Sequence, residues 1–293
     1  MQISASMVKE LRERTGAGMM ECKKALVEAQ GDVGLAAENL RKAGQAKADK
    51  KAGRVAAEGV VAVQVVGGTA AVLELNCETD FVAKQDNFKD FARQVAQRAA
   101  ETATADVQTL AGMPLQASGG ETIEHQLRTL VATIGEKISL RRAVVHQLAG
   151  DRFGVYVHGS RIGVVVDLAG GDADLAKDVA MHVAASNPLA LDESGLAAEA
   201  LDKEKEILKA QIADSGKPPE IQEKMLSGRI AKYLKEVTLV GQPFVKDPDV
   251  TVGKLLSGAG ASIRCYTRLE VGEGIEKKSE NFAEEVMAQV RGS

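Results

Sequence analysis

The side chains that could carry out chemistry are few in this sequence, and they lie far apart along it. No histidine has a second histidine or a cysteine at the spacing of metal ligands, and none accompanies a nucleophilic serine or cysteine pattern. The cysteines form no metal-type pair, so we expect three reduced, mostly buried thiols. We expect structural roles for most of these residues, which are His125, His146, His158, His182, Cys22, Cys77 and Cys265.

Two glycine-rich segments, Gly16-Ala17-Gly18 and Gly258-Ala259-Gly260, resemble parts of a phosphate-binding loop. Such a loop follows a β-strand and contains further glycines at fixed positions, because its backbone N–H groups must surround the phosphate. No strand is expected before residue 16, and neither segment completes a known glycine pattern. The sequence therefore disfavours a nucleotide-dependent enzyme.

The segment Leu75–Lys84 has the most unusual arrangement of residue types. A strand ends near Cys77, two acids follow, and Phe81 and Val82 come just before a helix. In one interpretation Phe81 points into the core, and Thr79 or Asp80 caps a helix. In the other, Phe81 is exposed on a rigid turn beside a carboxylate, which is typical of a hot spot for binding another protein. The residues alone are compatible with both interpretations.

The elements around this segment follow from the hydrophobic periodicity. Strands are predicted over 59–66 and 70–77, joined by a hairpin turn at Gly67-Gly68. A helix begins near Asp86 and carries Phe88, Phe91, Val95 and Ala99 on one face. We expect the polar stretch 104–120 to be mostly loop and 121–134 to form a further helix.

A similar pattern returns in the second half of the chain. Strands are predicted over 152–158 and 162–168, and a helix follows over 173–185. This weak internal repeat predicts two related α+β subdomains, each with an antiparallel sheet covered by helix. Residues 241–246 and 261–271 are expected to be strands that return to the second subdomain, with a helical turn between them.

The remaining segments are helical or basic. The first fifty residues predict three short helices, which is more typical of a docking module than of an enzyme. Residues 42–54 are rich in lysine and alanine and could be a solvated linker or a basic face. Two apolar stripes between 195 and 237 flank a turn at 215–219 and predict an antiparallel helical hairpin. A last amphipathic helix is expected over 280–290.

Charge and hydropathy exclude several classes of protein. The net charge of -4 argues against general nucleic-acid binding, which depends on phosphate neutralisation. No apolar run reaches the roughly 18 residues of a membrane span, and the N-terminus has no signal-peptide pattern. We expect a cytoplasmic protein. The basic stretch 42–54 leaves one alternative of another class, a ribosome- or RNA-associated interaction protein, which salt-sensitive RNA binding would support.

Five segments, distributed in order over nearly the whole chain, resemble signatures of the bacterial elongation factor Ts family. They are LRERTGAGMMECKKAL at 11–26, ELNCETDFVAK at 74–84, HGSRIG at 158–163, GQPFV at 241–245 and EVGEGIEK at 270–277. The resemblance is weaker over 104–120 and over 287–293. It implies a nucleotide-exchange factor that binds the GTPase elongation factor Tu in its GDP form and speeds GDP release, without being an enzyme.

The resemblance also implies a site. In the family the aromatic residue that matches Phe81 enters a pocket of the GTPase, with the acid matching Asp80 beside it. Insertion of the loop Thr79-Asp80-Phe81-Val82 would disturb the partner's magnesium and phosphate-binding site, so magnesium and GDP belong to the partner and no cofactor is expected here. Further residues that match family contacts are Arg12, Met19, Met20, Lys23, Ile134, Gly135, His158 and Val245.

The expected fold class is α+β, with a division of the chain that fits the family. A three-helix, UBA-like docking module and basic linker occupy 1–54, and the two core subdomains occupy 55–150 and 151–190 with 240–274. The helical hairpin 191–239 could join two copies of the protein or pack on its own core, and a C-terminal helical module occupies 275–293.

Overall fold

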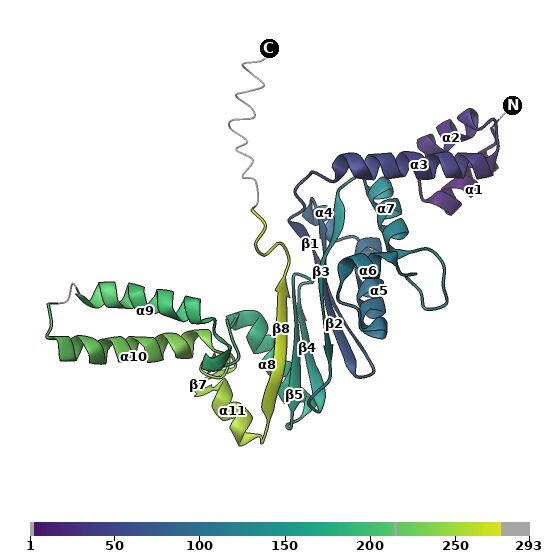
Figure 1. The fold of residues 1–293 in the computed structure, drawn as a ribbon. Coiled ribbons are helices and arrows are strands. Elements are labelled where there is room, and N and C mark those ends of the chain that lie inside the picture. The colour runs from purple at the N-terminus through teal and green to yellow at the C-terminus, as the bar shows by residue number, and fades with distance from the viewer. Residues whose placement is uncertain (1–2, 214–215, 277–293) are drawn as a thin grey trace, which may run out of the picture.

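The structure is a computed structural model that describes residues 3–213 and 216–276, without the side chains of residues 45–49. The C-terminal helix expected over 280–290 lies outside these residues. The described chain is α+β, as expected, with two three-stranded antiparallel sheets between an N-terminal helical module and a projecting helical hairpin (Figure 1). None of the described helices is long and apolar enough to cross a membrane.

Three helices form the N-terminal module: α1 (Ala5–Thr15), α2 (Met19–Glu28) and α3 (Val33–Lys51). Ser4 caps α1, and Gly16 ends it in the left-handed conformation. Leu11, Cys22 and Leu26 are fully buried in the small core of this module. Helix α3 continues to Lys51, so most of the basic stretch 42–54 is helical rather than an irregular linker. Its alanines and lysines are good helix formers.

The first sheet has the order β1-β2-β3 and is antiparallel throughout. Its strands are β1 (Glu58–Val66), β2 (Thr69–Cys77) and β3 (Ile138–Gln147). The β1–β2 hairpin was predicted from the sequence, whereas β3 was not. This strand shows no alternation of apolar and polar residues, because most of its side chains are half-buried and Arg141 and Arg142 interrupt the apolar run.

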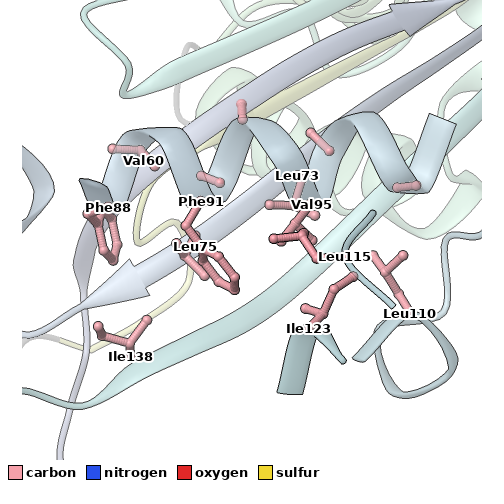
Figure 2. Close-up of a cluster of buried hydrophobic side chains, with 14 of the residues drawn as sticks. Val60, Leu73, Leu75, Phe88, Phe91, Val95, Leu110, Leu115, Ile123 and Ile138 are labelled. Atoms are coloured by element: carbon pink, nitrogen blue, oxygen red, sulfur yellow. The ribbon is translucent and has the colours of Figure 1, made fainter. Parts of the chain in front are cut away.

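Four helices accompany the first sheet: α4 (Asp80–Ala83), α5 (Asp86–Thr102), α6 (Val107–Gly112) and α7 (Ile123–Ile134). The predicted face of α5 packs on the sheet, and Phe88, Phe91 and Val95 fill the core in Figure 2. The expectation of a loop over 104–120 was partly wrong. Helix α6, capped by Asp106, delivers the buried Leu110 to this core, but a single helical turn leaves little periodic signal.

The second sheet has the order β4-β5-β8, with β4 (Arg152–His158), β5 (Ile162–Ala169) and β8 (Ser262–Glu270). Helix α8 (Ala173–Ser186) covers it. A Cβ atom at Gly154 would overlap the carbonyl oxygen of Ala176. Small residues therefore let α8 lie closer to its sheet than the phenylalanines of α5 would permit.

Between α8 and β8 the chain forms a 3-10 turn (Glu193–Gly195), α9 (Ala198–Ala213), α10 (Pro219–Val237), β6 (Pro243–Phe244), β7 (Asp247–Thr251) and α11 (Val252–Gly258). Helices α9 and α10 form the expected antiparallel hairpin, which projects from the body (Figure 1). The strand expected over 241–246 was partly wrong: β6 is shorter and pairs with β7 in a separate sheet. Pro243 has no N–H to donate, and Gln242 is instead bound to His182.

The two main sheets pack against each other. Val61, Val72, Val165 and Leu269 belong to one buried cluster between them. The backbone N–H of Val61 donates to the carbonyl oxygen of Ser160 at 2.8 Å. The turn between β4 and β5 thus lies beside the start of β1.

Candidate protein-docking site

Phe81 lies on α4, the one-turn helix that connects β2 to α5. Its side chain is 77% exposed, whereas the neighbouring Val82 and Ala83 are buried in the core of the first subdomain. Thr79 caps this helix by accepting a hydrogen bond from the backbone N–H of Val82. The interpretation of Phe81 as a core residue was therefore wrong, because the two residues after it occupy the core and direct it outward.

A charged pair borders the exposed ring. Lys84 donates a hydrogen bond to Asp80 at 2.6 Å, and this bond is the main reason that the pKa of the Asp80 carboxyl is lowered. The same ammonium lies 5.9 Å from the centre of the Phe81 ring. A cation near the face of an aromatic ring is attracted to it. The exposed part of α4 thus presents an aromatic surface with charge on its border, which suits docking to a protein.

Two glutamates hold the start of the segment Thr79-Asp80-Phe81-Val82, which is called the Phe81 loop below. Glu136 accepts hydrogen bonds from the backbone N–H groups of Glu78 and Thr79, at 3.1 and 3.0 Å, and from the Thr79 hydroxyl at 2.6 Å. In return, the Glu78 carboxylate accepts a bond of 2.6 Å from the N–H of Lys137. Arg54 pairs with Glu78 from the other side. Glu136 was not among the residues expected from the sequence, although an acid directly after the helix-ending Gly135 was a signal.

Cys77 lies beneath this loop and is fully buried. Its thiol donates to the carbonyl oxygen of Thr79 at 3.1 Å. Burial raises the pKa of the thiol to about 12, and the nearby carboxylates of Glu136 and Glu58 contribute in the same direction. The thiol is therefore protonated at neutral pH and is not a nucleophile. All three cysteines are free, as expected, with Cys22 buried and Cys265 half-buried.

The residues expected on the N-terminal module are exposed. Met19 and Met20, at the start of α2, are 60% and 75% exposed, and Arg12 and Lys23 also face solvent. Exposed methionines form adaptable apolar surfaces, which some proteins use to bind a partner.

Ile134 and Gly135 lie at the end of α7, between the N-terminal module and the Phe81 loop. Gly135 ends the helix in the left-handed conformation, and its carbonyl oxygen accepts a hydrogen bond from Lys51 of α3. Both residues are half-buried. Since Glu136 follows directly, the structure brings this helix end and the Phe81 loop together.

His158 and Val245 are exposed on the second subdomain. His158 contacts Tyr156, whose hydroxyl is 3.2 Å from Nδ1. Tyr156 and Lys246, the residue after Val245, line the same shallow hollow. The turn that follows His158 reaches the first sheet, because Arg161 pairs with Glu58 at 2.6 Å, and Glu58 is opposite Cys77 in the register. This turn and the Phe81 loop therefore lie at the same end of the two sheets.

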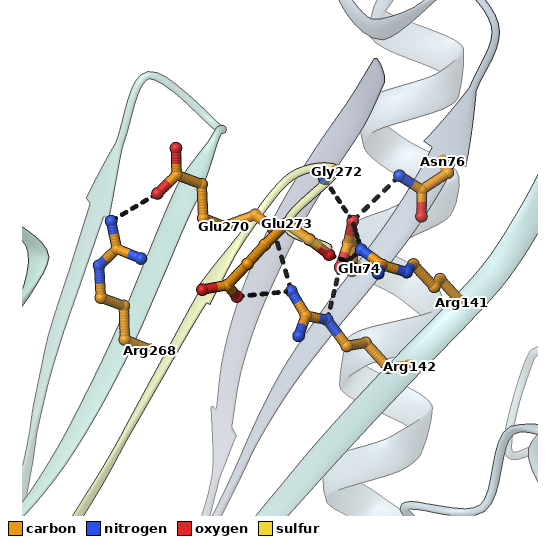
Figure 3. Close-up of polar contacts among 8 residues, drawn as sticks. All are labelled: Glu74, Asn76, Arg141, Arg142, Arg268, Glu270, Gly272 and Glu273. Atoms are coloured by element: carbon orange, nitrogen blue, oxygen red, sulfur yellow. Dashed lines mark hydrogen bonds and ion pairs between the residues drawn. The ribbon is translucent and has the colours of Figure 1, made fainter. Parts of the chain in front are cut away.

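A buried carboxylate joins the first sheet to the chain after β8 (Figure 3). Glu74 accepts hydrogen bonds from Asn76, Arg141, Arg142 and the backbone N–H of Gly272. Burial alone would raise the pKa of Glu74, but the bonds from Gly272, Asn76 and the arginines outweigh it, and the pKa is lowered. This cluster was not predicted from the sequence, because β3, which carries both arginines, was not predicted.

Within residues 3–213 and 216–276, no three histidine, cysteine or acidic side chains gather in a way that could hold a metal ion. His146 contacts Thr267 and Cys265, but burial lowers the pKa of the histidine and raises that of the thiol, so both are neutral. What the described surface does present is an aromatic residue on a fastened loop.

Several known proteins are similar in sequence to this chain over nearly its whole length. The family model described as Elongation factor TS matches residues 78–273. Elongation factor Ts of Thioalkalivibrio sulfidiphilus is 60% identical over 296 residues, and that of Methylococcus capsulatus is 57% identical over 295 residues, each with all of both chains covered. Elongation factor Ts of Francisella tularensis subsp. novicida is 56% identical over 292 residues and 99% of both chains. With relatives this similar from end to end, the chain belongs to the elongation factor Ts family.

Proposed function

We propose that the protein promotes GDP release from the GTPase elongation factor Tu by inserting Phe81 into it during translation elongation. Members of the elongation factor Ts family are nucleotide-exchange factors for this GTPase, and the chain belongs to that family. The mechanism is our inference. The observation that carries it is the outward position of Phe81 on a helix whose next two residues, Val82 and Ala83, are buried in the core.

The energetic basis is the transfer of an exposed ring into a partner's pocket. Burying a phenylalanine side chain stabilises a complex by roughly 1.5–3 kcal/mol. If the pocket exists only in the form of the partner that binds GDP weakly, the free energy gained by burying the ring lowers the partner's affinity for GDP. Exchange factor and nucleotide then lower each other's affinity by the same factor, about tenfold for each 1.4 kcal/mol.

The inserted loop would displace groups that hold magnesium and the phosphates in the partner. Both ligands belong to that GTPase, and we infer that the protein neither binds them itself nor makes a covalent bond. We place its action in the cytoplasm.

One aromatic residue cannot supply all of the binding free energy that GDP release requires. We therefore propose further contacts with the GTPase. We infer a UBA-like module over 1–54 that docks on the GTPase domain, and a second contact from the subdomain formed by 151–190 and 240–274. The inferred contact residues are Arg12, Met19, Met20, Lys23, Ile134, Gly135, His158 and Val245. Wide contact surfaces of this kind are usual where a few hot spots dominate the binding energy.

The test is the rate at which labelled GDP leaves elongation factor Tu when the protein is added. We expect Phe81→Ala to slow this release by about thirtyfold, since a hot-spot truncation is worth about 2 kcal/mol or more. Leu189→Ala is the matched control, because Leu189 is an apolar residue of the second subdomain that is 63% exposed. Release as fast as with the unmodified protein, from a folded Phe81→Ala variant, would refute the proposal.

We also propose that α9 and α10 could join two copies of the protein. Helix α9 buries only Leu208 and Ile212, and α10 has no fully buried residue among its described positions. Ile207 and Ile221 remain exposed on the hairpin. Measuring the mass of the protein in solution, with and without its GTPase, tests this idea, and a monomer at all concentrations would contradict it.

A further inference from the structure

The carboxylate of Glu136 holds the entry to the Phe81 loop from a distant part of the chain. Its Oε2 atom accepts both successive backbone N–H groups of Glu78 and Thr79, and its Oε1 atom accepts the Thr79 hydroxyl. Charge-assisted bonds of this type are stronger and shorter than neutral ones. Glu136 lies between Gly135, which ends α7, and Ile138, which begins β3. Its own position is therefore fixed by two regular elements.

The bond to the Thr79 hydroxyl reaches α4 directly. The Thr79 oxygen caps the helix by accepting the N–H of Val82, and its proton is directed to Glu136. One side chain thus orients the hydroxyl that starts the helix carrying Phe81. A helix as short as α4 does not persist without external support, because the cost of forming its first turn is not recovered.

A second carboxylate, that of Glu78, links the start of the Phe81 loop to Lys137, the residue after Glu136. Glu78 accepts the N–H of Lys137, while Lys137 donates through its ammonium to the carbonyl oxygen of Arg54 at 2.8 Å. Arg54 in turn pairs with Glu78. The junction at 135–137 is therefore bonded both to the Phe81 loop and to the chain that leaves the N-terminal module.

We propose that Glu136 is a positioning residue, which keeps the Phe81 loop in its inserting conformation before the partner arrives. This inference rests on the proposed exchange function. An exposed aromatic ring gains by folding back onto nearby apolar surface, and the bonds from Glu136 oppose that movement. If the loop holds the competent conformation only part of the time, apparent affinity falls by that fraction. The free energy of ordering the loop then opposes binding to the partner, and it does not slow the later release of GDP.

A kinetic experiment separates positioning from direct contact. GDP release from elongation factor Tu is measured over a range of concentrations of this protein. We expect Glu136→Ala to raise the half-saturating concentration about tenfold, which corresponds to a loop that is competent about a tenth of the time. The maximal rate should stay within about twofold. Phe81→Ala, in contrast, should lower the maximal rate.

Two further variants sharpen the result. Glu136→Gln keeps one oxygen that can accept a backbone N–H, so we expect it to recover part of the lost affinity. Glu124→Ala is the matched control, because Glu124 is an exposed acid of α7 that pairs only with Arg128 among the described ion pairs. It should leave both kinetic parameters unchanged.

Cys77 gives an independent readout that needs no partner. Its buried thiol bonds to Thr79, so movement of the loop should expose it to a thiol reagent such as 5,5′-dithiobis(2-nitrobenzoate). Loss of the Glu136 charge alone lowers the pKa of the Cys77 thiol, and Glu136→Gln shares that effect. In a Cys265→Ser background we therefore expect Glu136→Ala to speed labelling of Cys77 at least about tenfold and more than Glu136→Gln does, while urea unfolding shows both variants still folded. Cys22, buried in the separate core of the N-terminal module, should keep its slow rate.

The outcomes distinguish the two proposals. If Phe81→Ala leaves release unchanged, the exchange mechanism fails, yet faster labelling of Cys77 would still support the positioning role. If Phe81→Ala slows release but Glu136→Ala and Glu136→Gln match the unmodified protein in affinity and labelling, Glu136 is not a positioning residue. A fall in the maximal rate without a change in half-saturating concentration would likewise overturn it.

Discussion

The two subdomains share a hairpin followed by a helix, but they differ in the connection between the second strand and that helix. In the first subdomain the chain passes from β2 to α5 through α4, and Phe81 is exposed on the way. In the second it passes from β5 to α8 through Gly170, Gly171 and Asp172 alone. The repeated architecture thus carries a projecting loop in one copy and a minimal turn in the other.

The two connections are also held by different means. Gly170 and Gly171 have positive φ angles, and a Cβ atom at Gly170 would overlap the carbonyl oxygen of Gly260. The second connection therefore depends on backbone geometry that few other residues can adopt, in addition to the hydrogen bond that the Gly170 N–H donates to Asp151. The first is fixed by side chains, chiefly Glu136 and Thr79. The difference teaches that the exposed loop depends on side-chain hydrogen bonds, whereas the second connection depends on a glycine that leaves no room for a side chain.

The largest expected effect is on stability, from Gly170→Ala. The left-handed conformation costs a non-glycine residue roughly 1–2 kcal/mol, and overpacking adds about 1–3 kcal/mol. We expect the free energy of unfolding in urea to fall by about 3 kcal/mol. Gly67→Ala, in the β1–β2 turn, is the control, because it also has a positive φ but open space around it. Equal losses for the two variants would remove steric closure from the comparison.

Phe81→Ala should hardly change stability but should weaken binding to the partner. Surface substitutions usually change stability by no more than about 0.5 kcal/mol, so urea unfolding should hardly change. Calorimetric titration with nucleotide-free elongation factor Tu should show a loss of about 2 kcal/mol in binding. A large loss of stability would mean that the ring supports the fold, against its exposed position.

The helices that follow the two connections should differ in their response to acid. The buried face of α8 contains His182, whose Nε2 bonds to Gln242 and whose Nδ1 accepts the N–H of Val245. Burial lowers the pKa of His182, and the bond to Gln242 offsets this only in part. Below about pH 6.5 the unfolded histidine binds a proton that the folded one does not. The free energy of unfolding therefore falls as pH decreases.

We expect this slope to be at most about 1.4 kcal/mol per pH unit between pH 6.5 and 5. The buried face of α5 holds only apolar side chains, so this helix has no equivalent titrating group. The measurement is urea unfolding from pH 7 to 5 for the unmodified protein and His182→Gln, since groups such as His146 contribute equally to both. Parallel curves would show that His182 does not cause acid sensitivity.

Asp80→Ala should have the smallest effect. Asp80 and Lys84 are both largely exposed, and such ion pairs contribute little to stability. We expect no measurable change in unfolding and a smaller loss of GDP exchange than Phe81→Ala causes, because a charge at the border is usually worth less than a buried anchor. An equal or larger loss of exchange would reverse this ranking.

Much of the frame was predictable from local sequence signals. Gly67-Gly68 marks one hairpin, Gly159-Ser160 the other, and the spacing of Phe88, Phe91 and Val95 defines α5. The exposure of Phe81 was not predictable, because two adjacent apolar residues before a helix can each take the inner position. Val82 takes it here.

The contacts that fasten the site were hidden for another reason. Glu136 and Thr79 are 57 positions apart, so only the folded chain shows that they meet. Isolated acids in a sequence usually indicate solvated surface. Strand β3 was not predicted because Arg141 and Arg142 occupy positions where apolar residues would indicate a strand. Both arginines donate hydrogen bonds to the buried Glu74.

The cluster around Glu74 has a consequence for how the protein folds as it is synthesised. Glu74 and Gly272 are 198 positions apart, so the N–H that completes the carboxylate's hydrogen bonds leaves the ribosome long after the strand that carries it. Strand β8 likewise joins the second sheet only after the α9–α10 hairpin has emerged. Contacts of such long range slow folding. We therefore expect the second sheet and the hydrogen bonds of Glu74 to stay incomplete in a nascent chain until β8 and Gly272 have emerged. Until then the chain should depend on protection from aggregation.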